Sequence, residues 1–310
     1  MISKKAISPR PSIVFFGTGQ TSLEALRAVD SYYPIELVVT KPPALNSSGR
    51  LFKNAVQQWA EENAIVVINP ASKSDLIDKL KASDFKSKIG LVLDFGMVIP
   101  SEAIDMFPKG ILNSHFSLLP RHRGSNPIRA SILSGDTRTG VTIIKITPGL
   151  DDGPILSWGQ IEIGTSNAIE LRLELSKLND ALLPETIKLF LEGGLELLEQ
   201  DVDSITLTHK TTKQDGQIDC TKPAEQIERE IRAYQGWPKS FFSYDNKIFS
   251  VIEAKQSNKV VSAGKLELID KHLYLGCKDS SIEIIKIQPA GKPALSALDF
   301  INGYQNIIGK

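Results

Sequence analysis

The sequence predicts an α/β protein: a first domain built on a mostly parallel sheet with helices on both faces, then a smaller β-rich domain. Apolar strand-like runs alternate with helical runs over the first two thirds of the chain, which is typical of parallel sheets. Short strand-like runs separated by polar turns fill the last third. At 310 residues the chain also exceeds what one core usually serves, so two domains are expected.

The first domain opens with an apolar strand, a glycine turn at 17–19 and an amphipathic helix. Strands are expected at 12–16, 35–40, 64–68, 89–93, 110–113 and 140–146, and helices at 22–29, 53–63, 101–106 and 169–191. The last helix should be interrupted at Pro184, because proline removes a backbone donor. It is expected to close the domain.

A domain boundary is expected near 201–206, where two glycines and several acidic residues precede a new apolar pattern. The predicted domains are 1–205 and 206–310. The second begins with a helix at 224–234, followed by strands at 241–244, 248–252, 265–268, 272–275 and 282–287. The first two of these strands are joined by Asp245-Asn246 as a hairpin. Short strands joined by polar turns favour a small barrel.

Composition describes an ordinary globular protein, with 41% hydrophobic and 23% charged residues. No apolar run approaches the roughly 18 residues that span a bilayer. Pro9 and Pro11 lie close behind the first five residues and leave no apolar stretch long enough for a signal peptide, so a cytoplasmic location is expected. Cys220 and Cys277 have neither metal-ligand spacing nor a disulfide framework, and we expect free, buried thiols.

Charge argues against broad nonspecific binding of nucleic acid, since the chain holds 36 basic and 36 acidic residues. The second domain nevertheless has a small basic excess, with 15 Lys and Arg against 12 Asp and Glu over 206–310. A localised basic face on that domain is the expectation.

The candidate catalytic residues are Asn113, His115 and Asp151. Asn113 and His115 alternate along an extended segment, so both side chains should lie on one side of it. The segment ends a strand, and ligands of open α/β sheets bind beyond the carboxyl ends of strands. Asp151 follows in a glycine-flanked turn. A short motif of this kind also fits a plain strand and turn in which the histidine bonds only to backbone.

These three residue types suit acyl-type transfer to an amine. The Asn113 amide or a protonated His115 would stabilise negative charge developing on a carbonyl oxygen. His115 would take the amine's proton, and Asp151 would orient the ring and favour its charged form.

Two other features have alternative interpretations. Gly17-Thr18-Gly19 could expose backbone donors to phosphate, but the full dinucleotide fingerprint is absent and a structural turn is favoured. Arg121 and Arg123 could grip a phosphate or carboxylate, or could lie in a solvated loop. Their position directly after the candidate catalytic strand favours function.

Several longer segments extend these motifs: 117–128, 135–143 and 150–156, with 233–238 and 287–296 further on. In order and spacing the first three resemble the core of the folate-dependent formyltransferases. The last two resemble the second domain of the branch of that family that acts on methionyl-tRNA. The resemblance covers essentially the whole chain.

This resemblance implies a Rossmann-like catalytic domain and an OB-like barrel. The implied reaction moves the formyl group of 10-formyltetrahydrofolate to the α-amino group of methionyl initiator tRNA, for translation initiation, and no metal is expected. The implied folate contacts are Phe95, Gly96, Met97, Val98, Ser117, Leu118, Leu119 and Pro120; for 95–98, a core strand end is the alternative. We expect a monomer.

The residues expected to contact tRNA are Arg50, Lys53, Arg121, Arg123, Lys210, Lys213 and Arg232. The sequence departs from the family in the loop after the second strand, where a longer basic loop is usual and only Arg50 and Lys53 remain. Phe95 also replaces a common tyrosine, and Asn126 a small residue. The shortened loop puts in doubt how the initiator acceptor stem is distinguished.

Three other functions fit parts of the pattern. A sugar-nucleotide N-formyltransferase, acting on a UDP- or dTDP-amino sugar, would share the trio and the folate pocket. A formyl-folate hydrolase would use water in place of the amine, but usually carries an additional N-terminal domain. A tRNA-binding protein without activity would not require all three of Asn113, His115 and Asp151.

Overall fold

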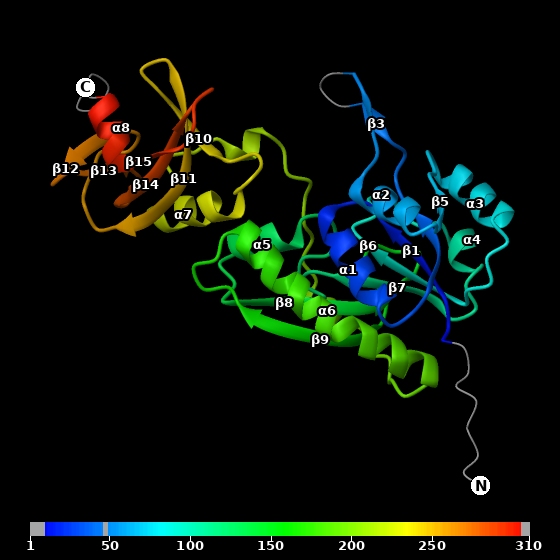
Figure 1. Ribbon diagram of the computed structural model, residues 1–310. Coiled ribbons are helices and arrows are strands. Elements are labelled where there is room, and N and C mark those ends of the chain that lie inside the picture. The colour runs from blue at the N-terminus through cyan, green and yellow to red at the C-terminus, as the bar shows by residue number, and fades with distance from the viewer. Residues whose placement is uncertain (1–9, 46–48, 305–310) are drawn as a thin grey trace, which may run out of the picture. The chain divides into compact units, whose positions relative to one another are not determined.

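The computed structural model describes residues 10–45 and 49–304, which form two compact units (Figure 1). Unit 1 runs to Gly124 and includes Gly140–Ile161 and Glu174–Leu207. Unit 2 comprises Ser125–Thr139, Glu162–Leu173 and the described residues from Thr208 on. Two segments that precede residue 174 thus cluster with the C-terminal residues.

A seven-stranded sheet organises the first half of the chain, in the order β5-β2-β1-β6-β7-β8-β9. Its strands are β1 Ile13–Gly17, β2 Ile35–Val39, β5 Val66–Ile68, β6 Ile89–Leu93, β7 Gly110–His115, β8 Arg138–Lys145 and β9 Ile155–Glu162. The strands from β5 to β7 are parallel, and β8 joins β7 antiparallel. The mostly parallel sheet is therefore confirmed.

Strand order reverses beside β1, since the chain goes to β2 on one side and returns to β6 on the other. Such a switch point opens a crevice at the carboxyl ends of the strands. The predicted glycine turn lies there and is tied down by Ser22, whose Oγ accepts from Thr18 N at 3.1 Å and donates to Leu93 O at 2.6 Å. These bonds agree with the interpretation of residues 17–19 as a structural turn.

Helices cover both faces of the sheet. They are α1 Gln20–Asp30, α2 Ala55–Glu62, α3 Lys73–Ala82, α4 Ser101–Ile104 and α6 Ala168–Glu192. Apolar residues of α3 and α4 pack with Val14, Phe16 and Ile111 in one buried cluster. On the opposite face Ser114 of β7 donates to Asn179 of α6. A further two-stranded sheet pairs β3 Ala44–Leu45 with β4 Leu51–Phe52.

Five elements of this part of the chain were not expected: β3, β4, α3, β9 and the short helix α5 Pro127–Leu133. The expected interruption of the long helix is wrong, because α6 continues through Pro184. Leu183 and Ile187 on either side are fully buried, so packing holds the helix despite the lost donor. The Pro184 carbonyl accepts from the Tyr33 hydroxyl at 3.2 Å.

Unit 2 contains an antiparallel sheet whose path is β10-β11-β14-β13-β12, with β15 beside β14. The strands are β10 Ser240–Tyr244, β11 Lys247–Ser257, β12 Leu266–Ile269, β13 His272–Gly276, β14 Ser281–Pro289 and β15 Leu295–Ser296. The predicted hairpin is present: Asp245 and Asn246 both have positive φ, as a two-residue turn of type I′ requires. The antiparallel β domain is confirmed.

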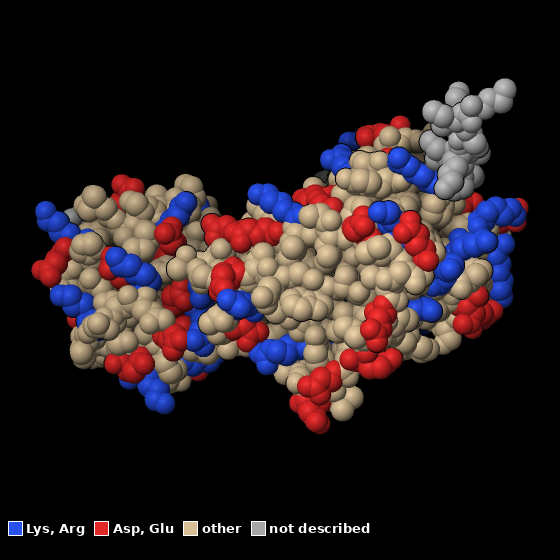
Figure 2. All heavy atoms as spheres, turned by 90° about the horizontal axis from the view of Figure 1, so that it is seen from below, with Lys and Arg blue, Asp and Glu red and all other residues tan. Residues whose placement is uncertain are grey.

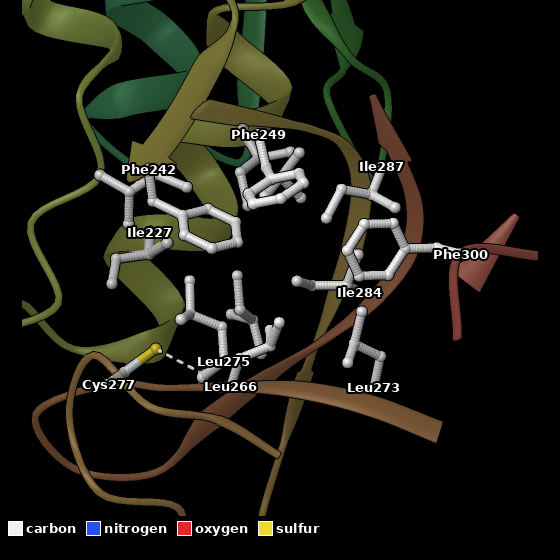
Figure 3. Packing of buried hydrophobic residues seen from close by; sticks show 14 of the residues in the cluster. Ile227, Phe242, Phe249, Leu266, Leu273, Leu275, Cys277, Ile284, Ile287 and Phe300 are labelled. Carbon is white, nitrogen blue, oxygen red and sulfur yellow. Dashed lines mark hydrogen bonds between the residues drawn. The ribbon is translucent and has the colours of Figure 1, made fainter. Parts of the chain in front are cut away.

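Helices α7 Ala224–Ala233 and α8 Ala297–Gly303 complete the core of this sheet. Figure 3 shows Phe249 between Phe242 and Ile287, and the ring centroids of Phe249 and Phe242 lie 5.8 Å apart. The Phe249 and Phe300 rings meet edge to face with centroids 5.4 Å apart. Short 3₁₀ turns occur at Val202–Ser204 and Gln214–Gly216. In the described part of the chain, no helix combines the length and apolarity needed to cross a bilayer.

Candidate active site

Strand β7 places Asn113 and His115 on the same face of the sheet, as their alternation predicts. Its neighbours fix this register, with Asn113 beside Val92 of β6 and His115 beside Thr142 of β8. Ile111 on this face is fully buried, whereas Asn113 is only partly buried. The carboxyl end of β7 therefore brings Asn113 to the edge of the core, whereas His115 is still buried.

Asp151 reaches these side chains from a tight turn. Its φ is +48°, a left-handed conformation that is unfavourable for a residue with a Cβ. Nearby, a Cβ at Gly153 would lie 1.8 Å from the Lys145 carbonyl oxygen, so only glycine fits there. The turn is thus shaped by its backbone, and it presents the Asp151 carboxylate toward β7.

The three candidate catalytic side chains meet at the carboxylate of Asp151. Asn113 Nδ2 donates to Asp151 Oδ1 at 3.1 Å, and His115 Nδ1 lies 3.5 Å from Asp151 Oδ2. The His115 side chain is 6% exposed and that of Asp151 is 16% exposed. The adjacent Asp152 accepts a hydrogen bond from the Thr147 hydroxyl. Of the two neighbouring aspartates, Asp151 is therefore the one that contacts Asn113 and His115.

The tautomer of His115 follows from its second partner. Its Nε2 lies 2.9 Å from the carbonyl oxygen of His122, which can only accept, so Nε2 carries a hydrogen. In the neutral ring Nδ1 is then the basic nitrogen, and it faces Asp151. The carboxylate is held in turn by Gly124 N, which donates to Oδ2 at 2.8 Å.

The residues expected to contact folate lie in two loops at this edge. In the first loop the Phe95 side chain packs in the core against Phe16, whereas Gly96 and Val98 are exposed. In the second, Thr142 Oγ donates to Ser117 O at 2.7 Å and accepts from Leu119 N at 3.1 Å. Because its side chain is buried in the core, Phe95 could contact a ligand only through its backbone.

The basic residues expected to contact tRNA differ in their surroundings. Arg50, Lys53, Arg121, Lys210 and Lys213 are exposed, and Lys53 also pairs with Glu61 at 2.6 Å. Residues 46–48 of the shortened loop lie outside the described residues.

Two arginines from the same set bond to the protein itself. Arg123 donates twice to Gln200, through Nε at 3.0 Å and Nη2 at 2.8 Å. Arg232 pairs with Glu228 at 2.7 Å and donates to Ser166 O at 3.1 Å. These bonds hold both guanidinium groups in place.

The structure adds residues that sequence reasoning missed, among them Gln200, Lys41 and Asp94. Lys41 and Asp94 each follow a strand, β2 and β6, which was an available signal. Glycines leave them space, because a Cβ at Gly19 would lie 2.6 Å from Asp94 Oδ2 and one at Gly96 would lie 2.4 Å from Lys41 Nζ. Desolvation raises the pKa of Asp94, and the charge of Lys41 offsets part of that rise.

Comparison with known proteins places two segments of the chain in described families. Residues 12–187 match the family described as formyl transferase, and residues 210–305 match the family described as formyl transferase, C-terminal domain. The methionyl-tRNA formyltransferase of Coxiella burnetii (strain RSA 331 / Henzerling II) is 31% identical over 298 residues, covering 94% of this chain and 95% of the relative.

Solved structures share the fold. The N-formyltransferase from Helicobacter canadensis, in complex with folinic acid and dTDP-3-aminofucose, has a TM-score of 0.66 at 19% identity and covers 90% of this chain and 99% of that chain. The methionyl-tRNA formyltransferase from Clostridium thermocellum has a TM-score of 0.54 at 19% identity, covering 82% of this chain and 96% of that chain.

Proposed function

The chain belongs to the formyl transferase family, and we propose from this that it transfers the formyl group of 10-formyltetrahydrofolate to the α-amino group of methionyl initiator tRNA. The nearly full-length match to a methionyl-tRNA formyltransferase supports this substrate. The observation that supports the chemistry most directly is the convergence of Asn113 and His115 on the Asp151 carboxylate.

In the proposed mechanism Asn113 stabilises the formyl oxygen. One of its two amide hydrogens is directed to Asp151, and the other remains to bond an oxygen that gains negative charge as the amine attacks. The bond to Asp151 fixes the direction of the amide before substrate arrives, so no reorganisation is needed during the reaction.

His115 and Asp151 handle the proton of the attacking amine. Since Nε2 of His115 is committed to the His122 carbonyl, the proton is taken on the side of Nδ1 and Asp151. The carboxylate attracts the positive charge that the ring gains while it holds this proton during the reaction. Asp151 is the more exposed of the pair, so it is the side from which a water can relay the proton.

The proposed folate site lies across the loops 95–98 and 117–120. An exposed Val98 and the positive-φ Gly96 offer an apolar surface with accessible backbone, a combination that suits a flat heterocycle. Folinic acid is bound in the related Helicobacter canadensis enzyme, which agrees with a folate co-substrate. The two loops follow the neighbouring parallel strands β6 and β7, so both lie at the carboxyl edge of the sheet.

The proposed tRNA contacts are the exposed Arg50, Lys53, Arg121, Lys210 and Lys213. Figure 2 shows basic and acidic side chains interspersed on the face seen there, rather than gathered in one basic band. Because the chain as a whole holds 36 basic and 36 acidic residues, a small number of phosphate contacts is proposed in place of a broad electrostatic surface. Arg123 and Arg232 are assigned to holding the fold, because their guanidinium groups are bonded internally.

The test is single-turnover transfer of labelled formyl from 10-formyltetrahydrofolate to methionyl initiator tRNA, methionyl elongator tRNA or a dTDP-amino sugar. Label on the initiator tRNA alone is expected. Label on the sugar would instead indicate a sugar-nucleotide N-formyltransferase, and release of free formate would indicate a hydrolase.

A variant pair tests the role of the histidine in the same assay. His115→Asn is expected to slow transfer by about 10²-fold or more, as for loss of a general base. The control is His272→Asn, which removes an exposed histidine paired with Glu283. Equal rates in the two variants would contradict the proposed mechanism.

A further inference from the structure

Gln200 is a buried glutamine that contacts both turns around the trio. It follows the segment in which Leu198 pairs with Ile155, through backbone bonds of 2.7 and 3.0 Å. The residue is 7% exposed. Its side chain points into unit 1, between the turn that carries Asp151 and the turn that follows His115.

The amide of Gln200 uses its full bonding capacity. Nε2 donates to the carbonyl oxygens of Asp151 and Gly153, both at 2.8 Å. Oε1 accepts from Arg123 Nε at 3.0 Å and from Arg123 Nη2 at 2.8 Å. Two donors and two lone pairs are all a glutamine side chain has, so no polar group of Gln200 remains for a substrate.

Each end of this amide holds one half of the catalytic geometry. Nε2 fixes two backbone carbonyls of the Asp151 turn, those of Asp151 and Gly153, and so restrains Asp151 in its left-handed conformation. Arg123, fixed by Oε1, lies between His122, whose carbonyl holds the His115 ring, and Gly124, whose amide holds the Asp151 carboxylate.

The same stretch of chain supports the turn a second time through Thr206. Its Oγ accepts from His122 N at 2.8 Å, its carbonyl accepts from Arg123 N at 2.9 Å, and its N donates to Pro120 O at 3.4 Å. Thr206 therefore lies beside the catalytic turn, where the next residue, Leu207, forms an isolated parallel β-bridge with Arg123.

We infer that Gln200 is a positioning residue for formyl transfer, which sets the alignment of Asp151 with His115 without touching substrate. This inference rests on the function proposed above. Because the alignment affects the reacting state more than substrate binding, loss of Gln200 lowers kcat and leaves KM for tRNA and folate nearly unchanged.

The kinetic test compares Gln200→Met with Gln57→Met. Gln57 is also a buried glutamine of unit 1, 5% exposed, but it bonds to Glu61 and Asn69 and not to the trio. Gln200→Met is expected to lose about 10- to 100-fold in kcat with KM within about threefold, a loss typical of a misaligned group. Gln57→Met should keep kcat within about twofold.

A second variant gives a pH signature. A carboxylate in Gln200→Glu cannot donate to the two carbonyls, whereas its protonated form donates to one of them. The ratio of its kcat to that of the wild type is therefore expected to rise as pH falls. Gln200→Glu also carries the test if Gln200→Met does not fold, because it keeps the size of the side chain.

A measurement without substrate separates this inference from the proposed function. Ring ¹⁵N signals of His115, assigned by comparison with His115→Asn, are expected to shift in Gln200→Met and to stay in place in Gln57→Met. Unchanged His115 signals, or equal kcat in the two methionine variants, would overturn the inference. Failure of the wild type to formylate tRNA, with shifted signals, would overturn only the proposed function.

Discussion

The most discriminating single change at the site is Asp151→Asn, because it keeps the shape of the side chain and alters only charge and donors. The carboxylate accepts from Asn113 on one oxygen and from Gly124 on the other. An amide at this position has one acceptor and one donor group, so in either orientation one N–H faces another N–H. One buried bond is lost, which lowers the free energy of unfolding by about 1–3 kcal/mol.

The effect on catalysis comes from the lost charge. An imidazolium and a carboxylate attract by about 4 kcal/mol at 4 Å when the effective dielectric is about 20, and His115 Nδ1 lies 3.5 Å from Asp151 Oδ2. Because the Asp151 side chain is 16% exposed, part of this attraction is screened. We expect a loss of about 2–4 kcal/mol in transition-state stabilisation, or about 30- to 1000-fold in rate.

Rapid-quench single-turnover transfer measures the rate, and urea unfolding measures the stability. The matched control is Asp152→Asn, which neutralises the neighbouring carboxylate that bonds to Thr147 instead of the trio. The control should retain the rate within about twofold. A wild-type rate in Asp151→Asn, with the fold intact, would refute the assignment of the carboxylate to the proton path.

Three further predictions concern stability and reactivity. Thr142→Val removes both bonds to the loop after His115 and leaves Leu119 N and Ser117 O unpaired; urea unfolding should show a loss of about 2–3 kcal/mol, which Thr142→Ser restores. Burial alone would raise the pKa of Glu36, but bonds from Ser12, Lys86 and Ser87 outweigh it and lower that pKa below its ordinary 4.5. The carboxylate therefore stabilises the fold at neutral pH, where Glu36→Gln should cost about 1–2 kcal/mol, and the difference from wild type should shrink as pH falls below 4.5. Burial raises the pKa of Cys277 to about 12, so iodoacetamide at pH 8 should leave it unmodified in the native protein and label it after unfolding.

The trio could be predicted from the sequence because its residues carry specific chemistry at informative spacing. Strand alternation alone puts Asn113 and His115 on one face, and the register of β7 confirms this. The glycines around Asp151 likewise indicate a turn. What the sequence does not contain is the partner of His115 Nε2, since a backbone carbonyl has no residue signature.

Gln200 escaped prediction for the same reason. Two of its bonds go to backbone oxygens, and it stands in a segment without periodicity. The missed helix α3 differs, because Ser72 caps it by accepting from Asp75 N, a usable signal. Its weak apolar pattern, with only Leu76 and Leu80 buried, concealed it. Strand β9 was hidden by outward residues such as the exposed Trp158.

The composition of unit 2 has a consequence for how the polypeptide can be divided. Helix α5 lies in the first half of the chain, yet it belongs to unit 2. There Arg129 donates to Trp237 O at 2.8 Å, and Gly135 leaves room for Arg229 of α7. A gene cut between codons 205 and 206 would therefore separate α5 from α7. During synthesis, roughly a hundred residues must be added after α5 before its packing partner α7 exists. The two units are therefore not contiguous stretches of sequence that recombination could exchange independently.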